Sequence, residues 1–167
     1  QLSSILYHAT AGINADCLSP YGSMLNQLYL IVNDVEGIQP GSYRFLQRAN
    51  ALELLTHGNF REKAGFLGLE QNIPADASVN VYMLADLEAI IGTFGSRGYR
   101  MAQLEAGIIG GKLYLMAYAL KLGASGLTFY DKEVVEFFSP SAKDLTAMFL
   151  VALGKSSKPE TKSKPLD

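Results

Sequence analysis

The sequence predicts one α+β domain over residues 1–154, in which helices pack against a β-sheet. The 167 residues are 49% hydrophobic, which is enough for one core and too short a chain for two ordinary domains. Segments with strand-like and helical apolar spacing are mixed along the chain without strict alternation, and no internal repeat is visible. These observations favour a sheet with helices packed on it.

The first elements follow from apolar spacing and turn residues. A helix is predicted over residues 3–11, where apolar residues recur at helical spacing, and Gly12 stands at its C-cap. Residues 27–32 form a β-branched and aromatic run that predicts a buried strand. Pro40-Gly41 suits the centre of a type II turn, and the alternating residues 42–46 predict the next strand.

The middle of the chain predicts two further strands and a helix. Residues 51–55 are expected to be extended, and residues 78–85 are a further strand candidate. Asn59 with Glu62 three residues later is a capping pattern, and helical spacing continues from there to a helix that ends near Gly68.

The longest periodic element is a helix over about residues 99–122, with Gly123 as its stop. Asp86 is a plausible N-cap of the shorter helix before it. The long helix is hydrophobic nearly all round, which predicts burial on several sides. Its interior glycines each cost about 1 kcal/mol relative to alanine, so close contact with another helix or a flat ligand is the expected reason for them. They are Gly107, Gly110 and Gly111.

The C-terminal part predicts two strands around a short helix. Residues 124–129 are strand-like, Asp131 can cap a helix over residues 132–138, and residues 147–153 read as a final buried strand. Residues 155–167 contain prolines and lysines but no aromatic residue, so an extended or disordered tail is expected.

Composition excludes several function classes. The net charge of −2 gives no indication of a nucleic-acid partner. The longest apolar run, 113–120, is far shorter than the roughly 20 residues of a membrane span. The single cysteine, Cys17, excludes an internal disulfide and favours a cytoplasmic protein; it is either a small buried hydrophobe or a reactive thiol. The two histidines form no metal-binding pattern, so no metal site is predicted.

The densest group of polar residues lies around the start of the long helix. It comprises Arg97, Tyr99 and Arg100, with Glu105 further along. Two interpretations stay open: helix capping with an Arg–Glu ion pair, or a functional site. Lys112, which stands between apolar neighbours, is expected to reach toward solvent rather than act as a catalytic amine.

A continuous series of motifs makes the sequence similar to one enzyme family. Over roughly residues 2–154 it resembles the SagB-type dehydrogenases of the nitroreductase superfamily, which includes McbC-like azoline oxidases. The matching segments are Leu28-Tyr29-Leu30-Ile31-Val32, Val35-Glu36-Gly37, Pro40-Gly41-Ser42-Tyr43, Arg97-Gly98-Tyr99-Arg100, Leu104-Glu105-Ala106-Gly107, Leu113-Tyr114-Leu115, residues 119–124 and residues 149–154.

The resemblance implies a nitroreductase-like α+β fold, with a central, mainly antiparallel sheet flanked by helices. It implies FMN as the cofactor and packing of two such domains through the long helix, either as a homodimer or with a second domain of the same type. The flavin sites would then be built across the interface. Members of the family pass hydride or electron pairs through the flavin, with small-molecule or peptide substrates such as azolines, nitro compounds or quinones.

The resemblance also assigns flavin-site positions in three segments. Ser19 keeps the hydroxyl of a Pro-Ser-Ala-Gly loop in the family. In the same segment, Tyr21 replaces the glycine of that loop, and Gly22 follows it. Arg97, Tyr99 and Arg100 would line or brace the site. In the third segment, the backbone N–H groups of Thr128, Phe129 and Tyr130 would meet the flavin N5 edge.

The sequence departs from the family at two further places. Thr93-Phe94 stands where some azoline oxidases have a Lys-Tyr pair, and the arginine-rich N-terminal helix that grips the FMN phosphate in typical members is missing from a chain that starts at Gln1. The phosphate would then be bound by the tail or by a partner domain, which suggests one half of a tandem protein. Two hypotheses follow: an FMN-dependent oxidoreductase domain, or a catalytically silent dimerisation half that completes a partner's flavin site.

Overall fold

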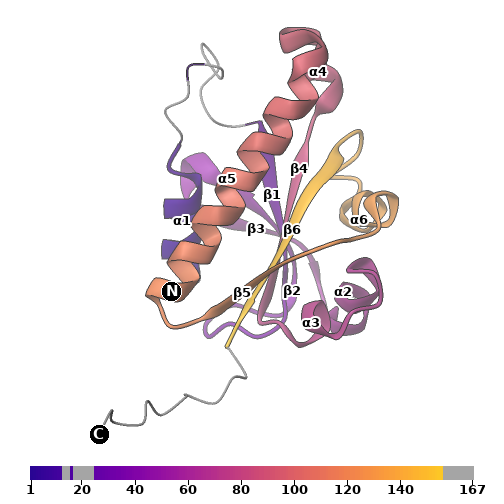
Figure 1. Ribbon diagram of the computed structural model, residues 1–167. Coiled ribbons are helices and arrows are strands. Elements are labelled where there is room, and N and C mark those ends of the chain that lie inside the picture. Colours follow the sequence, from indigo (N-terminus) through magenta and orange to yellow (C-terminus); the bar gives the residue numbers. More distant parts are fainter. Residues whose placement is uncertain (13–15, 17–24, 156–167) are drawn as a thin grey trace, which may run out of the picture.

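A computed structural model describes residues 1–12, 16 and 25–155 (Figure 1). Its centre is a six-stranded sheet with the strand order β3-β2-β1-β4-β6-β5, in which every neighbouring pair is antiparallel. The predicted α+β class with a mainly antiparallel sheet is therefore confirmed. The strands are β1 (Asn26–Val32), β2 (Gly41–Leu46), β3 (Ala51–His57), β4 (Val79–Ala85), β5 (Gly123–Leu127) and β6 (Thr146–Gly154).

Helices cover both faces of the sheet (Figure 1). The long helix α5 and the N-terminal helix α1 lie on one face, and α2, α3 and α6 lie at the other side of the sheet. Helix α4 continues from the end of β4 and leads into α5. The helices are α1 (Leu2–Thr10), α2 (Arg61–Leu67), α3 (Asn72–Asp76), α4 (Leu87–Phe94), α5 (Gly98–Ala119) and α6 (Asp131–Phe138), with short 3-10 turns η2 (Gln47–Ala49) and η3 (Gly95–Arg97).

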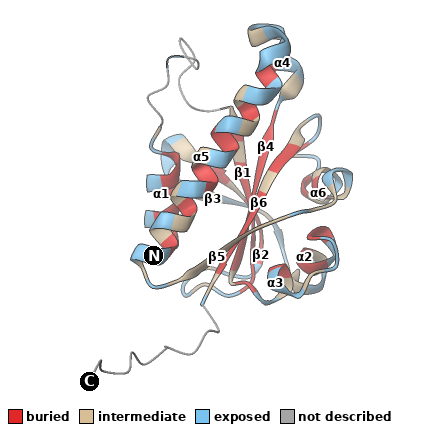
Figure 2. Ribbon diagram, in the orientation of Figure 1, coloured by how far each residue is buried: buried red, intermediate tan, exposed pale blue. Residues whose placement is uncertain are grey.

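Strand alternation divides the core into two clusters. Leu28 and Leu30 of β1 pack with α1 and α5, whereas Tyr29 and Ile31 pack with α2 and α6. Successive side chains of a strand point to opposite faces, so a strand covered on both faces must be apolar at nearly every position. The central strands β1 and β4 are buried along almost their whole length (Figure 2), which explains why their uninterrupted apolar runs were readable from the sequence.

The turn before β2 differs from the prediction. Pro40-Gly41 does not form the centre of the turn, because Gly41 already begins β2. The turn lies earlier, where the N–H of Ile38 donates to the carbonyl of Val35 (3.1 Å) and Gly37 has a φ of 79°. Only a residue that tolerates positive φ suits that position, and glycine does so without strain.

The long helix ends three residues earlier than predicted. Its last residue is Ala119, and Lys121 adopts the left-handed conformation with a φ of 58°. The N–H of Leu122 donates to the carbonyl of Ala117 (2.8 Å), and the N–H of Lys121 donates to Tyr118 (3.0 Å). This pair of bonds is a Schellman motif in which lysine occupies the usual glycine position, so Gly123 does not stop the helix but opens β5.

Two predicted caps also differ. The N-cap of α2 is Phe60 rather than Asn59, whose Oδ1 accepts from the N–H of Arg61 (3.2 Å). Asp131 is the first residue of α6, and the N-cap is Tyr130, without a side-chain cap. The predicted Asp86 cap is confirmed, since its Oδ1 accepts from the N–H of Ala89 (3.0 Å).

Two further observations complete the fold. Helix α3 was not predicted, because it is only five residues long and contains a proline.

Across the described segments, no helix is both long and apolar enough to pass through a membrane.

Candidate functional site

The predicted flavin positions fall in three segments, of which the structure describes two. Ser19, Tyr21 and Gly22 lie outside the described residues, as does Cys17. The other two segments are the junction of α4 with α5 and the connection from β5 to α6. Figure 1 shows these two connections at separate edges of the domain. One chain therefore does not bring Arg97–Arg100 and Thr128–Tyr130 together.

A glycine allows the two helices to pack closely at the α4–α5 junction. A Cβ at Gly98, the first residue of α5, would lie 2.9 Å from the carbonyl oxygen of Ile90. The side chains next to it face outward: Arg97 and Arg100 are exposed, and the hydroxyl of Tyr99 accepts from Gln103 Nε2 (3.2 Å). The junction therefore presents two guanidinium groups and a phenol at the surface, where a ligand or partner can reach them.

Glu105 is buried and does not form the predicted ion pair with these arginines. This residue is only 1% exposed. Instead, Glu105 Oε2 accepts from the backbone N–H of Asn26 (2.7 Å) and from Asn26 Nδ2 (2.9 Å). Asn26 Nδ2 also donates to the carbonyl of Ala102 (2.9 Å). These bonds tie α5 to the first residue of β1.

The environment of Glu105 favours its neutral form. Burial raises the pKa of this carboxyl above its ordinary value, and the hydrogen bonds from Asn26 and the backbone of Leu25 lower it in opposition. Among the described residues, Glu105 Oε1 and Asn26 Oδ1 have no hydrogen-bond partner. Sequence analysis missed Asn26. The available signal was a carboxylate on the small-residue face of α5, a position that needs a polar partner.

The β5–α6 connection is anchored by its last residue. The N–H of Tyr130 donates to the carbonyl of Leu67 (2.9 Å), and the Tyr130 ring lies 5.4 Å from that of Phe66. The hydroxyl of Thr128 accepts from Gln71 Nε2 (3.4 Å), while Phe129 packs against the α6-side core. The Tyr130 N–H is therefore already hydrogen-bonded within the chain. A backbone hydrogen bond from this loop to a ligand would come from Thr128 or Phe129.

The outer face of α5 is apolar and open, contrary to the expectation that this helix is buried on several sides. Leu104, Leu115 and Tyr118 are 51%, 70% and 59% exposed. A Cβ at Gly107 or Gly111 would meet no atom within 4 Å. Within one chain α5 thus buries a single face, and the other is an apolar stripe with two glycines in it.

The inner glycine of α5 makes a close contact, but with a side chain of strand β6 rather than with the predicted helix or flat ligand. A Cβ at Gly110 would lie 2.5 Å from Cε1 of Phe149, and one at Gly126 of β5 would lie 3.0 Å from Cζ of the same ring. The Phe149 ring therefore fits between the helix and the edge strand only because both positions are glycine. Lys112 Nζ donates to the carbonyl of Gly12 (2.6 Å), so it fixes the end of α1 rather than reaching freely into solvent.

Metal chemistry finds no support in the described residues. No group of three or more histidine, cysteine, aspartate or glutamate side chains among residues 1–12, 16 and 25–155 is placed to hold a metal ion.

The fold has clear relatives among solved structures, although no protein-family model and no curated protein sequence matches the chain. A provisionally named nitroreductase from Anabaena variabilis is 30% identical, with a TM-score of 0.78 over 92% of this chain and 32% of that chain. These neighbours support the predicted resemblance to the nitroreductase superfamily. The predicted nitroreductase-like fold is therefore confirmed.

Two further solved structures share the fold at lower sequence identity. A chain of the Escherichia coli microcin synthetase McbBCD complex, solved with truncated pro-MccB17 bound, has a TM-score of 0.75 at 18% identity and covers 94% of this chain and 63% of its own. An FMN-dependent nitroreductase from Clostridium difficile has a TM-score of 0.58 at 16% identity, covering 95% of this chain and 76% of its own. FMN is the cofactor of this family.

The chain is shorter than these proteins. It spans about a third of the Anabaena variabilis chain and just under two thirds of the microcin synthetase chain. What those whole proteins do is therefore not transferred directly to this domain.

Proposed function

We propose that this chain is an FMN-dependent oxidoreductase domain that works as a homodimer or with a second domain of its own type. It would pass hydride or electron pairs between the flavin and a small-molecule or peptide substrate, such as an azoline, a nitro compound or a quinone. The observation that carries the proposal is the nitroreductase fold, shared over 92% of the chain with a structure 30% identical to it.

The chain's own residues suit a bound flavin at two places. The N–H groups of Thr128 and Phe129 are donors of the kind that flavin N5 and its neighbouring carbonyl accept. Arg97 and Arg100 are exposed cations at the α4–α5 junction, where they can line or brace an anionic cofactor. When bound, FMN supplies the hydride chemistry, and the protein contributes orientation and electrostatics.

The outer face of α5 supports a partner in this function. Its exposed leucines and its open glycines form a surface against which a second helix can lie at short distance. Pairing there would bring the α4–α5 junction of one domain to the β5–α6 connection of another. These two segments lie apart within a single chain. The greater length of the Anabaena variabilis chain and the McbBCD assembly are in keeping with such pairing.

The second candidate function is a catalytically silent half that completes a partner's flavin site. Two sequence features favour it, namely Tyr21 in place of the loop glycine and Thr93-Phe94 in place of a Lys-Tyr pair. The commitment of the Tyr130 N–H to Leu67 also reduces the donors that the chain can offer to a flavin of its own.

A flavin-retention experiment separates the two functions. The purified chain is mixed with FMN, freed of excess cofactor by gel filtration, and its visible spectrum is recorded. Retained flavin with a shifted absorbance band supports the oxidoreductase, and NADH or NADPH is then tested as donor with nitro, quinone and azoline acceptors. A colourless protein that dimerises supports the silent half and overturns independent activity.

A further inference from the structure

The sheet opens between β1 and β2. Strand β1 pairs with β4 along all seven of its residues, Asn26–Val32, but with β2 only from Tyr29 to Val32. Strand β2 instead stays with β3 as far as Leu46 and then turns into η2. The first three residues of β1 therefore have no neighbour on that side, and a cleft of about 280 Å³ lies there.

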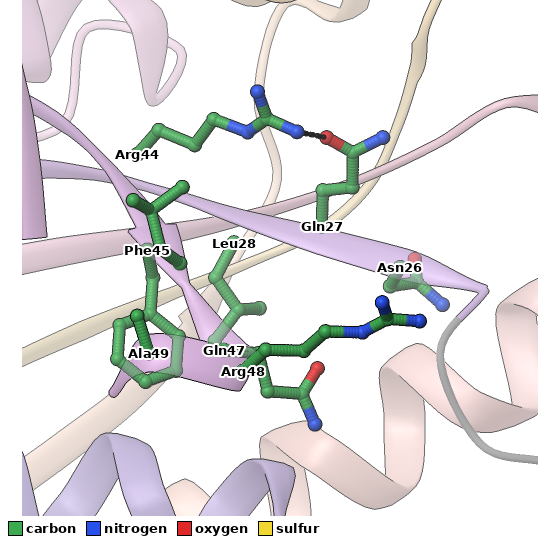
Figure 3. A pocket seen from close by; sticks show the side chains of 9 residues that line it. Asn26, Gln27, Leu28, Arg44, Phe45, Gln47, Arg48 and Ala49 are labelled. Carbon is green, nitrogen blue, oxygen red and sulfur yellow. Dashed lines mark hydrogen bonds between the residues drawn. The ribbon is translucent and has the colours of Figure 1, made fainter. Parts of the chain in front are cut away.

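The cleft combines an apolar floor with cationic and amide groups. Leu28 and Phe45 supply the apolar part, and the described residues that line the cleft include no aspartate or glutamate. Figure 3 shows the side chains of Arg44 and Gln27 facing each other on one side of β1, while Arg48 extends toward Asn26 on the other. The volume is at the small end for a ligand site, which suits a compact molecule.

The arginines and amides are partly uncommitted. Arg44 Nη2 donates to Gln27 Oε1 (2.9 Å), which holds this guanidinium in place. Arg48 is exposed, and its guanidinium has no hydrogen bond or ion pair with the described residues. Asn26 is only 5% exposed, its amide nitrogen is bound to α5, and its Oδ1 has no partner among the described residues. A buried acceptor without a partner costs free energy that a ligand donor would recover.

We propose that this cleft binds a small molecule with one anionic group, a carboxylate or a phosphate, attached to a short apolar body. The Arg48 guanidinium binds the anion, the apolar body lies on Leu28 and Phe45, and Asn26 Oδ1 accepts a hydrogen bond from a ligand hydroxyl or N–H. Arg44, fixed by Gln27 on the opposite side of β1, adds positive potential. The residues that line the cleft include none of the described flavin positions, which lie at the α4–α5 junction and in the β5–α6 connection.

The test is a titration followed by NMR. Isotope-labelled protein is titrated with phenyl phosphate and, separately, with benzoate, each against sodium chloride at equal ionic strength. The proposal predicts saturable shifts confined to the amides of residues 26–28 and 44–49 with at least one of the two probes. FMN as a third probe separates the sources of a phosphate: shifts of the same amides with FMN mean that the cleft receives the flavin's own phosphate, and their absence means a separate ligand.

Charge variants complete the test. Arg48→Gln leaves an exposed position uncharged and is expected to weaken probe binding about tenfold or more, because a charge-assisted bond is lost. Lys143→Gln removes an equally exposed charge far from the cleft in sequence and is expected to leave the affinity unchanged. Absence of saturable shifts with both phenyl phosphate and benzoate, or equal affinity in Arg48→Gln and the unchanged protein, would overturn the proposal.

Discussion

The contact between α5 and the Phe149 ring can be tested by replacing Gly110 with alanine. The new Cβ would lie 2.5 Å from Cε1 and 2.9 Å from Cδ1 of Phe149, against about 3.5–4.0 Å for ordinary carbon contacts, so ring or helix must move by about 1 Å. The ring has little room to move toward β5, because that strand also approaches it closely. A Cβ at Gly126 would lie only 3.0 Å from Cζ of the ring. Overpacking of this kind costs about 1–3 kcal/mol, and the helix gain of alanine over glycine returns about 1 kcal/mol.

The neighbouring glycine provides the matched control. A Cβ at Gly111 meets nothing within 4 Å, so Gly111→Ala is expected to gain the full helix propensity, about 1 kcal/mol, at protein concentrations low enough to keep the chain monomeric. Urea unfolding of both variants should give Gly110→Ala a free energy of unfolding about 1–3 kcal/mol lower than that of Gly111→Ala. Equal stability of the two variants would refute the packing that is described for Phe149.

Three further predictions concern groups that sequence analysis did not place. The folded-state pKa of Glu105 is raised, so the folded protein holds the proton of this carboxyl more tightly than the unfolded chain does. The stability that this proton contributes is fully present below the ordinary pKa of 4.5 and is lost as the pH rises through the folded-state pKa. The stability of the unchanged protein relative to Glu105→Gln should therefore decline over that range in denaturant titrations, and a constant difference would contradict this. Asn26→Ala removes both side-chain donations to α5 and should lower the free energy of unfolding by about 2 kcal/mol or more, measured with urea; a neutral effect would show that these bonds do not hold β1 to the helix. Lys121→Gly relieves the strain of a left-handed backbone at φ 58°. It should raise the free energy of unfolding by about 1 kcal/mol, observed as a higher melting temperature, whereas destabilisation would argue against the Schellman motif at the end of α5.

The sequence predicted the elements whose signal is local. Strands β1, β4 and β6 are apolar at nearly every position because helices cover both faces of the sheet, and this pattern identifies them. Boundaries were less predictable where an unexpected residue adopts the special backbone conformation. Lys121 takes the position that glycine usually fills, and Gly37 rather than Pro40-Gly41 makes the turn.

Contacts between distant residues could not be predicted from such patterns. Asn26 and Glu105 are 79 positions apart, and either residue by itself is compatible with an exposed site. The flavin positions came from resemblance rather than from spacing, and the structure shows that two of their segments lie at separate edges of the domain. The glycines of α5 were expected to face another helix or a flat ligand, but Gly110 meets the ring of Phe149, because helical spacing does not identify the partner.

We propose that a flavin site is formed where two such domains meet through α5. The most direct measurement is light scattering of the chain after gel filtration with FMN, with flavin absorbance recorded across the same peak and Gly111→Leu as the interface variant. The account predicts flavin on a particle of twice the chain mass, and loss of both dimer and flavin when leucine fills the open glycine position of the α5 face. A monomer that carries flavin, or a variant that loses the dimer and keeps its flavin, would contradict it.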